Sequence, residues 1–170
     1  MVKIELVKPS YEMETMIFEL VSEFKVHKED IINGCCGLMR CNDYCEWMEY
    51  IRQVENGLID RTPSSTFVAI DTISKSIVGI IDIRHYLNEK HYYSGHIGYS
   101  IRPNLRCKGY GTEIIQLGIE KAKDINIENL LISCKKSNIA SQKVIERNKG
   151  ILEKEIFDDG EVYLVYWIRV

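Results

Sequence analysis

The sequence lacks the segments that are typical of membrane, secreted and disordered proteins. No apolar run approaches the roughly 20 residues of a membrane helix, and the opening MVKIELVKPS has no apolar core long enough for a signal peptide. The chain has only three prolines, no low-complexity tract, no internal repeat and no linker rich in Pro, Gly or Ser. We therefore expect one ordered domain over residues 1–170, located in the cytoplasm and without a membrane partner.

The sequence also lacks a long basic patch. Its formal net charge is −3, and its lysines and arginines are scattered along the chain, so we expect no nucleic-acid partner. A small cationic or amine substrate is compatible with this mildly acidic balance.

The six cysteines lack the spacing of a metal or redox site. None forms C-x-x-C, and those between residues 35 and 45 do not have the paired spacing of a structural zinc site. We expect no metal, and free thiols that are mostly small buried hydrophobes. The six are Cys35, Cys36, Cys41, Cys45, Cys107 and Cys134.

The length and the hydrophobic pattern favour a single α/β domain. A chain of 170 residues can bury about 70% of its unfolded surface, and 45% of these residues are hydrophobic. Short turns between the middle strands predict an antiparallel meander, and a strand–helix–strand crossover predicts one parallel pair. We expect strands at residues 2–7, 66–71, 77–85, 96–102 and 130–134, a final hairpin turning at 158–160, and helices from residues 10, 43, 111 and 137.

The most informative stretch reads GYSIRPNLRCKGYG and continues as TEIIQLGIEKA. A strand runs through a basic loop into Gly109 and Gly111 and then directly into an amphipathic helix. The glycines allow close approach of the backbone, and the helix start adds unpaired N–H donors, so this order predicts a phosphate or pyrophosphate site. Gly118 falls on the apolar stripe of the helix, which predicts close packing on a sheet.

Two common phosphate loops do not fit this stretch. No glycine is followed by Lys and then Ser or Thr in a Walker frame, and the third glycine of a dinucleotide fingerprint is replaced by Ile114. The remaining pattern is R-x-x-G-x-G, from Arg106 to Gly111. With its flanking strand and helix, it resembles the pyrophosphate motif [QR]-x-x-G-x-[GA] of the GNAT superfamily of acyl-CoA-dependent N-acetyltransferases.

The resemblance implies a GNAT-type α/β fold, with a mixed, mostly antiparallel sheet of about six or seven strands and about four helices. It also implies acetyl-CoA as acyl donor, with main-chain groups of Tyr99, Ser100 and Ile101 along the pantetheine arm. The segment from Ser137 resembles the second family motif, N-x-x-[AS], although Asn138 is equally a helix cap. The implied cofactor contacts are Ser100, Ile101, Arg106, Lys108, Gly109, Tyr110, Gly111, Thr112, Asn138 and Ser141.

The proton-transfer groups are less well defined by the sequence. Many relatives carry a tyrosine acid seven residues after the motif asparagine, and Ile145 occupies that position here. Water or another hydroxyl can replace it, and Tyr99 is a candidate, with core packing as its alternative role. His96 and His85 lie at strand ends and are candidate bases, with a structural role as the alternative. Asn88 and Glu89, in the loop between them, are candidates for orienting an amine.

Two functions of different classes remain open from the sequence. The first is transfer of an acetyl group to a primary amine of a small molecule or a peptide, by direct reaction in a ternary complex. The second is a non-catalytic acyl-CoA-binding module, which the missing tyrosine favours. The runs R-H-x-L-N-E and G-H-I-G-Y resemble a poorly characterised bacterial subgroup of GNAT proteins, which leaves the acceptor undefined. Pairing of two copies through the final hairpin, as a homodimer, is also left open.

Overall fold

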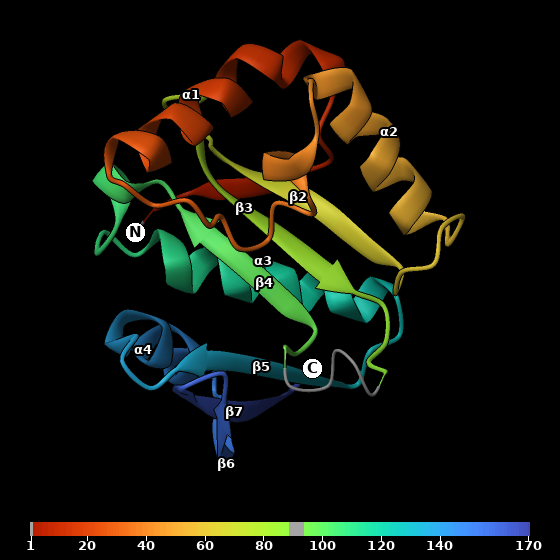
Figure 1. The fold of residues 1–170 in the computed structure, drawn as a ribbon. Helices are drawn as coiled ribbons and strands as arrows, with labels where there is room; N and C mark the ends of the chain where they lie inside the picture. The colour runs from red at the N-terminus through yellow and green to blue at the C-terminus, as the bar shows by residue number, and fades with distance from the viewer. Residues whose placement is uncertain (1, 89–93) are drawn as a thin grey trace.

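A computed structural model describes residues 2–88 and 94–170 of the chain (Figure 1). The described residues form two antiparallel sheets, ordered β1-β2-β3-β4 and β5-β7-β6, together with four α-helices. The predicted α/β fold is therefore confirmed. The strands are β1 (Ile4–Val7), β2 (Ser64–Asp71), β3 (Ile77–Arg84), β4 (Ile97–Ile101), β5 (Asn129–Lys135), β6 (Ile151–Asp158) and β7 (Glu161–Arg169), and the helices are α1 (Glu14–Val26), α2 (Tyr44–Glu55), α3 (Tyr110–Asp124) and α4 (Ile139–Arg147).

Helices α1 and α2 cover one face of the first sheet (Figure 1). The predicted cap of α2 is confirmed, because the Asp43 carboxylate accepts a hydrogen bond from the Glu46 N–H at 2.8 Å. Large apolar side chains such as Phe24 and Trp47 are almost fully buried between these helices and the sheet. None of the helices in the described residues is long and apolar enough to cross a membrane.

Helix α3 covers the opposite face of the first sheet (Figure 1). The prediction that Gly118 packs closely on a sheet is confirmed, because a Cβ at this position would lie 2.7 Å from Ile81 Cδ1. A second hydrophobic core, containing Ile81, Ile114 and Ile115, joins α3 to both sheets. Ile81 of β3 lies in this core and Ile80 in the core under α1 and α2, so neighbouring residues of β3 contribute to opposite faces of the sheet.

The two sheets part between β4 and β5, and this corrects the predicted parallel pair. In the part of the chain that the structure describes, β4 is an edge strand, and β5 pairs antiparallel with β7 instead. Leu131, for example, lies opposite Trp167. The edge of β4 beyond its first residues consequently has no strand partner among the described residues. The prediction assumed that the crossover from β4 through α3 returns to the strand beside β4, whereas β7 occupies the position next to β5.

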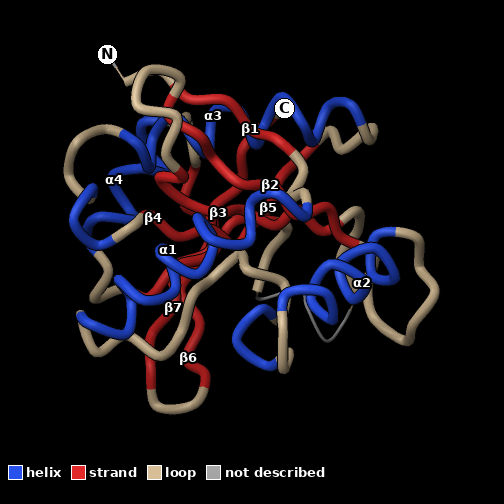
Figure 2. Tube along the Cα trace, turned by 90° about the horizontal axis from the view of Figure 1, so that it is seen from above, coloured by secondary structure: helices blue, strands red, loops and turns tan. Residues whose placement is uncertain are grey.

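The last two strands form the expected hairpin. Asp159 and Gly160 connect β6 to β7, and both have positive φ angles, 46° and 78°, as a primed two-residue turn requires. The turn lies at the edge of the molecule (Figure 2), and β6 is the outer strand of its sheet.

Candidate active site

A row of unpaired backbone N–H groups precedes and opens α3. In the described residues, no hydrogen bond is found that is donated by the backbone N–H of any residue from 107 to 111. Cys107 and Gly109 have φ angles of 60° and 98°, a left-handed alternation that forms concave anion sites. The positive end of the helix dipole lies at the same place. The predicted phosphate loop thus has both the donors and the shape to hold an anion.

The two basic side chains of this loop are engaged with protein groups. The Arg106 guanidinium donates two hydrogen bonds to the Glu29 carboxylate, at 2.7 and 2.8 Å, and the Arg106 side chain thereby lowers the pKa of Glu29. The Lys108 ammonium donates to the Asn104 carbonyl oxygen at 3.0 Å. In this structure the side chains hold the loop in place, and the N–H groups are its free donors.

Two further predicted contact residues also support the loop. The Tyr110 hydroxyl donates to the Asp71 carboxylate at 2.9 Å, and this bond raises the pKa of Tyr110. The Ser74 N–H, and after it the Tyr110 hydroxyl, lower the pKa of Asp71 by donating to its carboxylate. The Thr112 N–H donates to the Gly109 carbonyl oxygen at 3.1 Å, so it already belongs to the first turn of α3. The donor row therefore ends at Gly111.

The start of α4 meets β4 through two hydroxyl groups. The Tyr99 hydroxyl lies 3.2 Å from Ser141 Oγ, and burial raises the pKa of Tyr99. Asn138 accepts a hydrogen bond from the Ser141 N–H at 3.1 Å, so it caps α4. A Cβ on Gly111 would lie 3.8 Å from Tyr99 Cε2. The structure thus brings together Tyr99, Ser141, Asn138 and the end of the N–H row.

The other two strand residues of the predicted cofactor contacts lie on the same strand. Ser100 is half-buried, and Ile101 is buried in the core. The Ile101 carbonyl oxygen accepts a hydrogen bond from Arg106 Nε at 3.3 Å. Their main chain belongs to β4, whose second edge has no strand partner in the described residues.

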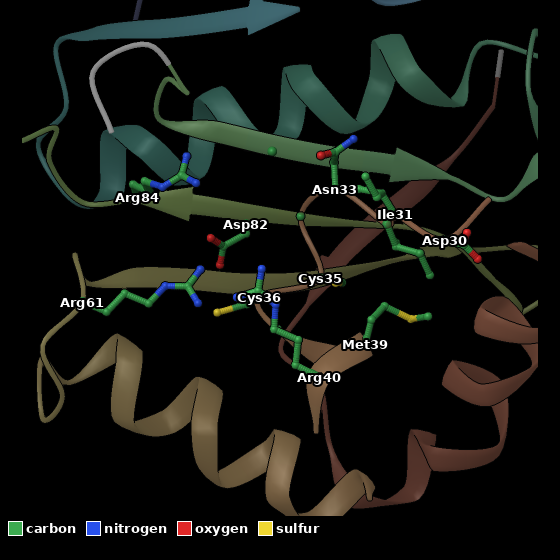
Figure 3. Close-up of a pocket in the computed structure, with 14 residues that line it drawn as sticks. Asp30, Ile31, Asn33, Cys35, Cys36, Met39, Arg40, Arg61, Asp82 and Arg84 are labelled. Atoms are coloured by element: carbon green, nitrogen blue, oxygen red, sulfur yellow. The ribbon is translucent and has the colours of Figure 1, made fainter. Parts of the chain in front are cut away.

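A cavity of about 310 Å³ lies on the α1 and α2 side of the first sheet (Figure 3). Its walls come from the loop of residues 30–40, from Asp82 and Arg84 on β3, from Arg61, and from Gly98 on β4. Asp82 lies opposite Gly98 in the strand register, and Thr66 donates a 2.8 Å hydrogen bond to its carboxylate. Strand β4 therefore borders both the cavity and, at its far end, the loop that leads to the N–H row.

The cavity loop rests directly on β4. Gly34 has a φ of 79°, and a Cβ at this position would lie 2.3 Å from the Gly98 carbonyl oxygen. Only glycine allows this conformation and this approach without strain. The position of the loop over β4, and with it the shape of the cavity, depends on this contact.

Sequence reasoning missed the cavity residues. The available signal was the pair Asp82 and Arg84 in the otherwise apolar strand IVGIIDIR, because buried charges are costly and are retained for a purpose. Cys36 also lines the cavity, and burial, aided by Asp82, raises its pKa to about 11. Its thiol is thus protonated near neutral pH. In the described residues, no group of three or more His, Cys, Asp or Glu is arranged to hold a metal ion.

His96, a predicted base, joins the two sheets. Its backbone N–H donates to the Leu131 carbonyl oxygen at 2.7 Å, and the Leu131 N–H donates to His96 Nδ1 at 3.0 Å. The side chain is only 7% exposed, and burial lowers its pKa to about 4. With Nδ1 occupied as an acceptor, Nε2 carries the proton, so the ring has no free lone pair for an ammonium proton. We assign His96 a structural role.

This contact predicts a pH-dependent stability. Because the folded-state pKa of His96 is below its unfolded value, the stabilisation is complete above about pH 6.5 and is lost as the pH falls toward 4. We expect urea unfolding between pH 7 and pH 4.5 to show a loss approaching roughly 3 kcal/mol from this residue. His96→Asn, which retains an acceptor but does not titrate, should flatten the dependence; an equally steep dependence in that variant would assign it to other groups.

His85, the other predicted base, does not line the cavity. Its Nε2 lies 2.9 Å from Ser65 Oγ, which donates to Glu55 at 2.6 Å. The carboxylate contacts the serine rather than the imidazole, which is not the order of a nucleophilic triad. Burial lowers the pKa of His85. Asn88 donates to Thr62 at 2.9 Å, and the predicted amine-orienting residue Glu89 is outside the described residues.

Comparison with known proteins defines the family of the chain. The family model described as acetyltransferase (GNAT) domain matches residues 6–150. The chain therefore belongs to the GNAT acetyltransferase family. A curated relative is the uncharacterized N-acetyltransferase YnaD of Bacillus subtilis (strain 168), which is 28% identical over 99 residues. That match covers 55% of this GNAT chain and 56% of YnaD, so the chain spans only about half the length of that relative.

Solved GNAT structures share the fold at low sequence identity. The ribosomal-protein-S5-alanine acetyltransferase from Vibrio fischeri has a TM-score of 0.70 and 16% identity, covering 98% of this chain and 91% of that one. The microcin C7 self-immunity acetyltransferase MccE, solved with acetyl-CoA and AMP, has a TM-score of 0.70 and 18% identity, covering 99% and 93%. These likenesses extend the fold assignment over nearly the whole GNAT chain.

Proposed function

We propose that this GNAT protein transfers the acetyl group of acetyl-CoA to the primary amine of a small molecule, directly within a ternary complex. The observation that carries the proposal is the position of β4. Near its start, Gly98 lines the cavity, and its other end leads to the N–H row of residues 107–111. A donor and an acceptor bound at these two places would meet along one strand. MccE, which shares the fold, was solved with acetyl-CoA.

The N–H row is suited to the pyrophosphate of the donor. Its five backbone donors and the helix dipole stabilise negative charge without a side chain. The pantetheine arm then follows the open edge of β4 at Tyr99, Ser100 and Ile101, as an added strand would. Lys108 adds positive potential at the mouth of the loop, Arg106 holds the loop through its ion pair with Glu29, and Asn138 lies at the start of α4.

The transfer itself needs few protein groups. The neutral amine nitrogen attacks the thioester carbon, a C–N bond forms and the C–S bond breaks; the attacking nitrogen loses one proton and the CoA sulfur gains one. A substrate that arrives as an ammonium first gives a further proton to water. This scheme involves no acyl-enzyme. The cavity thiol Cys36 is a poor nucleophile, because burial and the nearby Asp82 charge keep it protonated. Intact mass measured on the catalytic time scale should show no acetylated cysteine; an adduct at Cys36, Cys107 or Cys134 would refute direct transfer.

Tyr99 is our candidate for the general acid. Ile145, at the family's tyrosine position, is fully buried, whereas the Tyr99 hydroxyl reaches the start of α4 at Ser141. Its raised pKa keeps the hydroxyl protonated and able to give a proton to the departing sulfur.

We expect Tyr99→Phe to lower kcat by about 10²- to 10⁴-fold, the usual contribution of general acid catalysis, with the affinity for CoA nearly unchanged. Steady-state rates of thiol release and a CoA titration measure the two effects. Tyr86→Phe, at a well-exposed tyrosine, is the matched control. A Tyr99→Phe enzyme with the wild-type kcat would remove Tyr99 from the mechanism.

A non-catalytic acyl-CoA-binding module is the second candidate function. Ile145 favours it, since this position lacks the usual acid. Both functions predict binding of CoA, and they differ in turnover. Only the enzyme releases CoA thiol when an amine is added. The amount of thiol released then equals the amount of amine acetylated.

A thermal-shift comparison of acetyl-CoA, CoA, ATP and NAD at equal concentration tests the cofactor. Ligand at about 100 times its dissociation constant adds about 2.7 kcal/mol of stability, which raises the midpoint of a domain of this size by several degrees. We expect a shift with acetyl-CoA and CoA alone, and thiol release from acetyl-CoA with the correct amine. A shift only with ATP or NAD would overturn the proposal.

Three expectations about the whole protein are kept as proposals. They are a single domain over residues 1–170, a cytoplasmic location, and a homodimer formed through the final hairpin. For the homodimer, the support is the outer strand β6, on which Ile151 and Phe157 are 74% and 75% exposed. Light scattering of the wild type and of Phe157→Lys measures the assembly.

A further inference from the structure

Three arginines line the cavity, Arg40, Arg61 and Arg84, and two of them, Arg61 and Arg84, lie at the end that contains Asp82. Arg61 donates from Nη1 to the Tyr50 hydroxyl at 2.8 Å, and Arg84 donates from Nη1 to the Gly95 carbonyl oxygen at 2.6 Å. Neither forms an ion pair within the part of the chain that the structure describes, whereas Arg106 does. Both guanidinium groups are thus held in position by uncharged groups, and their positive charge is available to an anionic ligand.

The remaining nitrogens of both guanidinium groups reach the cavity. Every buried side-chain nitrogen or oxygen in the described residues has a hydrogen-bond partner. The guanidinium nitrogens of Arg61 and Arg84 that make no hydrogen bond are therefore not buried, and both residues line the cavity. Figure 3 shows the two side chains at one end of the cavity, with the Asp82 carboxylate near both. Two accessible guanidinium edges form a site for a carboxylate, which accepts two parallel N–H bonds from each edge that it meets.

Asp82 does not neutralise this end of the cavity. Its side chain is only 5% exposed, and its carboxylate accepts a hydrogen bond from the Thr66 hydroxyl rather than from an arginine. Burial lowers the pKa of Arg84, Asp82 opposes that effect, and Arg61 adds to it. Three arginines and two aspartates, Asp30 and Asp82, line the cavity, and the two arginines beside Asp82 leave an excess positive charge at that end, which an anionic ligand would balance.

The size of the cavity and the position of Asp82 limit the ligand further. A volume of about 310 Å³ is at the lower end of the roughly 300–1,000 Å³ typical of small-molecule sites. Asp82 lies opposite Gly98, where the proposed donor strand borders the cavity, so an ammonium or amine beside Asp82 would be close to β4. A ligand with an amine and a carboxylate a few bonds apart can place its amine beside Asp82 and its carboxylate against Arg61 and Arg84.

We propose that the acceptor is a small amino acid, with its carboxylate held by Arg61 and Arg84 and its amino group beside Asp82. This inference rests on the proposed acetyl transfer, and it names the acceptor of the same site. A polyamine that extended from Asp82 toward Arg61 and Arg84 would place its second ammonium against two arginines, which disfavours it at this end of the cavity. The N–C bond formed and the C–S bond broken are those of the transfer described above.

The test compares each amino acid with the amine that remains when its carboxylate is removed. The twenty protein L-amino acids and their decarboxylated amines are measured in the presence of acetyl-CoA, by thiol release, and in the presence of CoA, by thermal shift. We expect at least one amino acid to be acetylated with a KM at least about 30-fold below that of its decarboxylated amine, because a buried charge pair is lost in the latter. Binding alone, seen by thermal shift, tests the carboxylate site even without turnover.

Variants then assign the effect to the two arginines. Arg61→Gln and Arg84→Gln should each raise the KM of the amino acid by about 30-fold or more and reduce its preference over the amine. Arg61→Lys, which keeps the charge but not the guanidinium fork, should be intermediate. Arg52→Gln, on the exposed surface of α2, is the matched control, and the thermal shift with acetyl-CoA should be the same in all four.

The outcomes separate this inference from the proposed function. Acetylation of decarboxylated amines at least as fast as of the amino acids, or no amino acid that binds or reacts, would overturn the inference and leave acetyl transfer standing. Loss of the acetyl-CoA shift in the wild type would overturn the proposed function; amino-acid binding that depends on Arg61 would still support the carboxylate site.

Discussion

Gly109→Asp should abolish CoA binding while the fold stays intact. The position has room, since a Cβ there would approach no atom more closely than 3.8 Å, and Asp is among the few residues that tolerate a left-handed backbone and cap a helix well. The damage is electrostatic: a carboxylate about 4 Å from a phosphate costs from about 1 kcal/mol in water to about 4 kcal/mol near a protein surface. The loop lies at the protein surface, where the larger cost applies, so we expect a CoA dissociation constant on the order of 10²- to 10³-fold higher.

Gly109→Asn is the matched control for this charge. It has the same shape, the same tolerance of positive φ and the same capping ability, but it is neutral. Calorimetric titration of CoA into both variants, with circular dichroism to monitor the fold, measures the difference. Equal affinity in the Asp variant and the wild type would remove residues 107–111 as the phosphate site, and equal loss in both variants would assign the effect to backbone strain.

Gly34→Ala should impair use of the acceptor while CoA still binds. The added methyl group would lie 2.3 Å from the Gly98 carbonyl oxygen and 2.9 Å from Tyr99 Cα, both of them backbone atoms that cannot rotate away. The loop of residues 30–40 must therefore lift from β4. Because a displacement of about 1 Å in a reacting group costs on the order of 10²-fold in rate, we expect kcat/KM for the amine to fall by about that factor.

Gly160→Ala separates the clash from the conformational cost. Gly160 has nearly the same φ, 78°, but no atom lies within 4 Å of the position of its Cβ. It should lose only about 1 kcal/mol of stability and none of the activity. Denaturant unfolding and kinetics on both variants provide the comparison. Wild-type kinetics for Gly34→Ala would show that the loop does not shape the acceptor site.

The sequence was most informative where the physical signal is local. The helix stripe around Gly118, the cap at Asp43 and the turn at Asp159 each depend on residues within a few positions, and the structure has all three. The loop from Arg106 to Gly111 was recognised for the same reason, since its glycines and the following helix are adjacent in the chain.

The sequence was least informative where the partner is distant. The role of His96 depends on Leu131, 35 positions away, and a histidine at a strand end gives no sign of that contact. The parting of β4 from β5 depends on whether β7 occupies the other position, which hydrophobic alternation does not encode. Arg61 and Arg84 line one cavity only once β3 pairs with β2, which begins three residues after Arg61 and places Ser64 opposite Arg84.

The order of the cavity walls along the chain has a consequence for how such proteins diverge. Apart from Gly98, the cavity-lining residues that the structure describes lie between positions 30 and 84, whereas the N–H row, Tyr99 and Ser141 all lie after position 97. A single genetic crossover between codons 84 and 97 would exchange the cavity walls as one block and leave the anion loop unchanged. Gene recombination between two relatives could thus give one of them the other's acceptor in a single event.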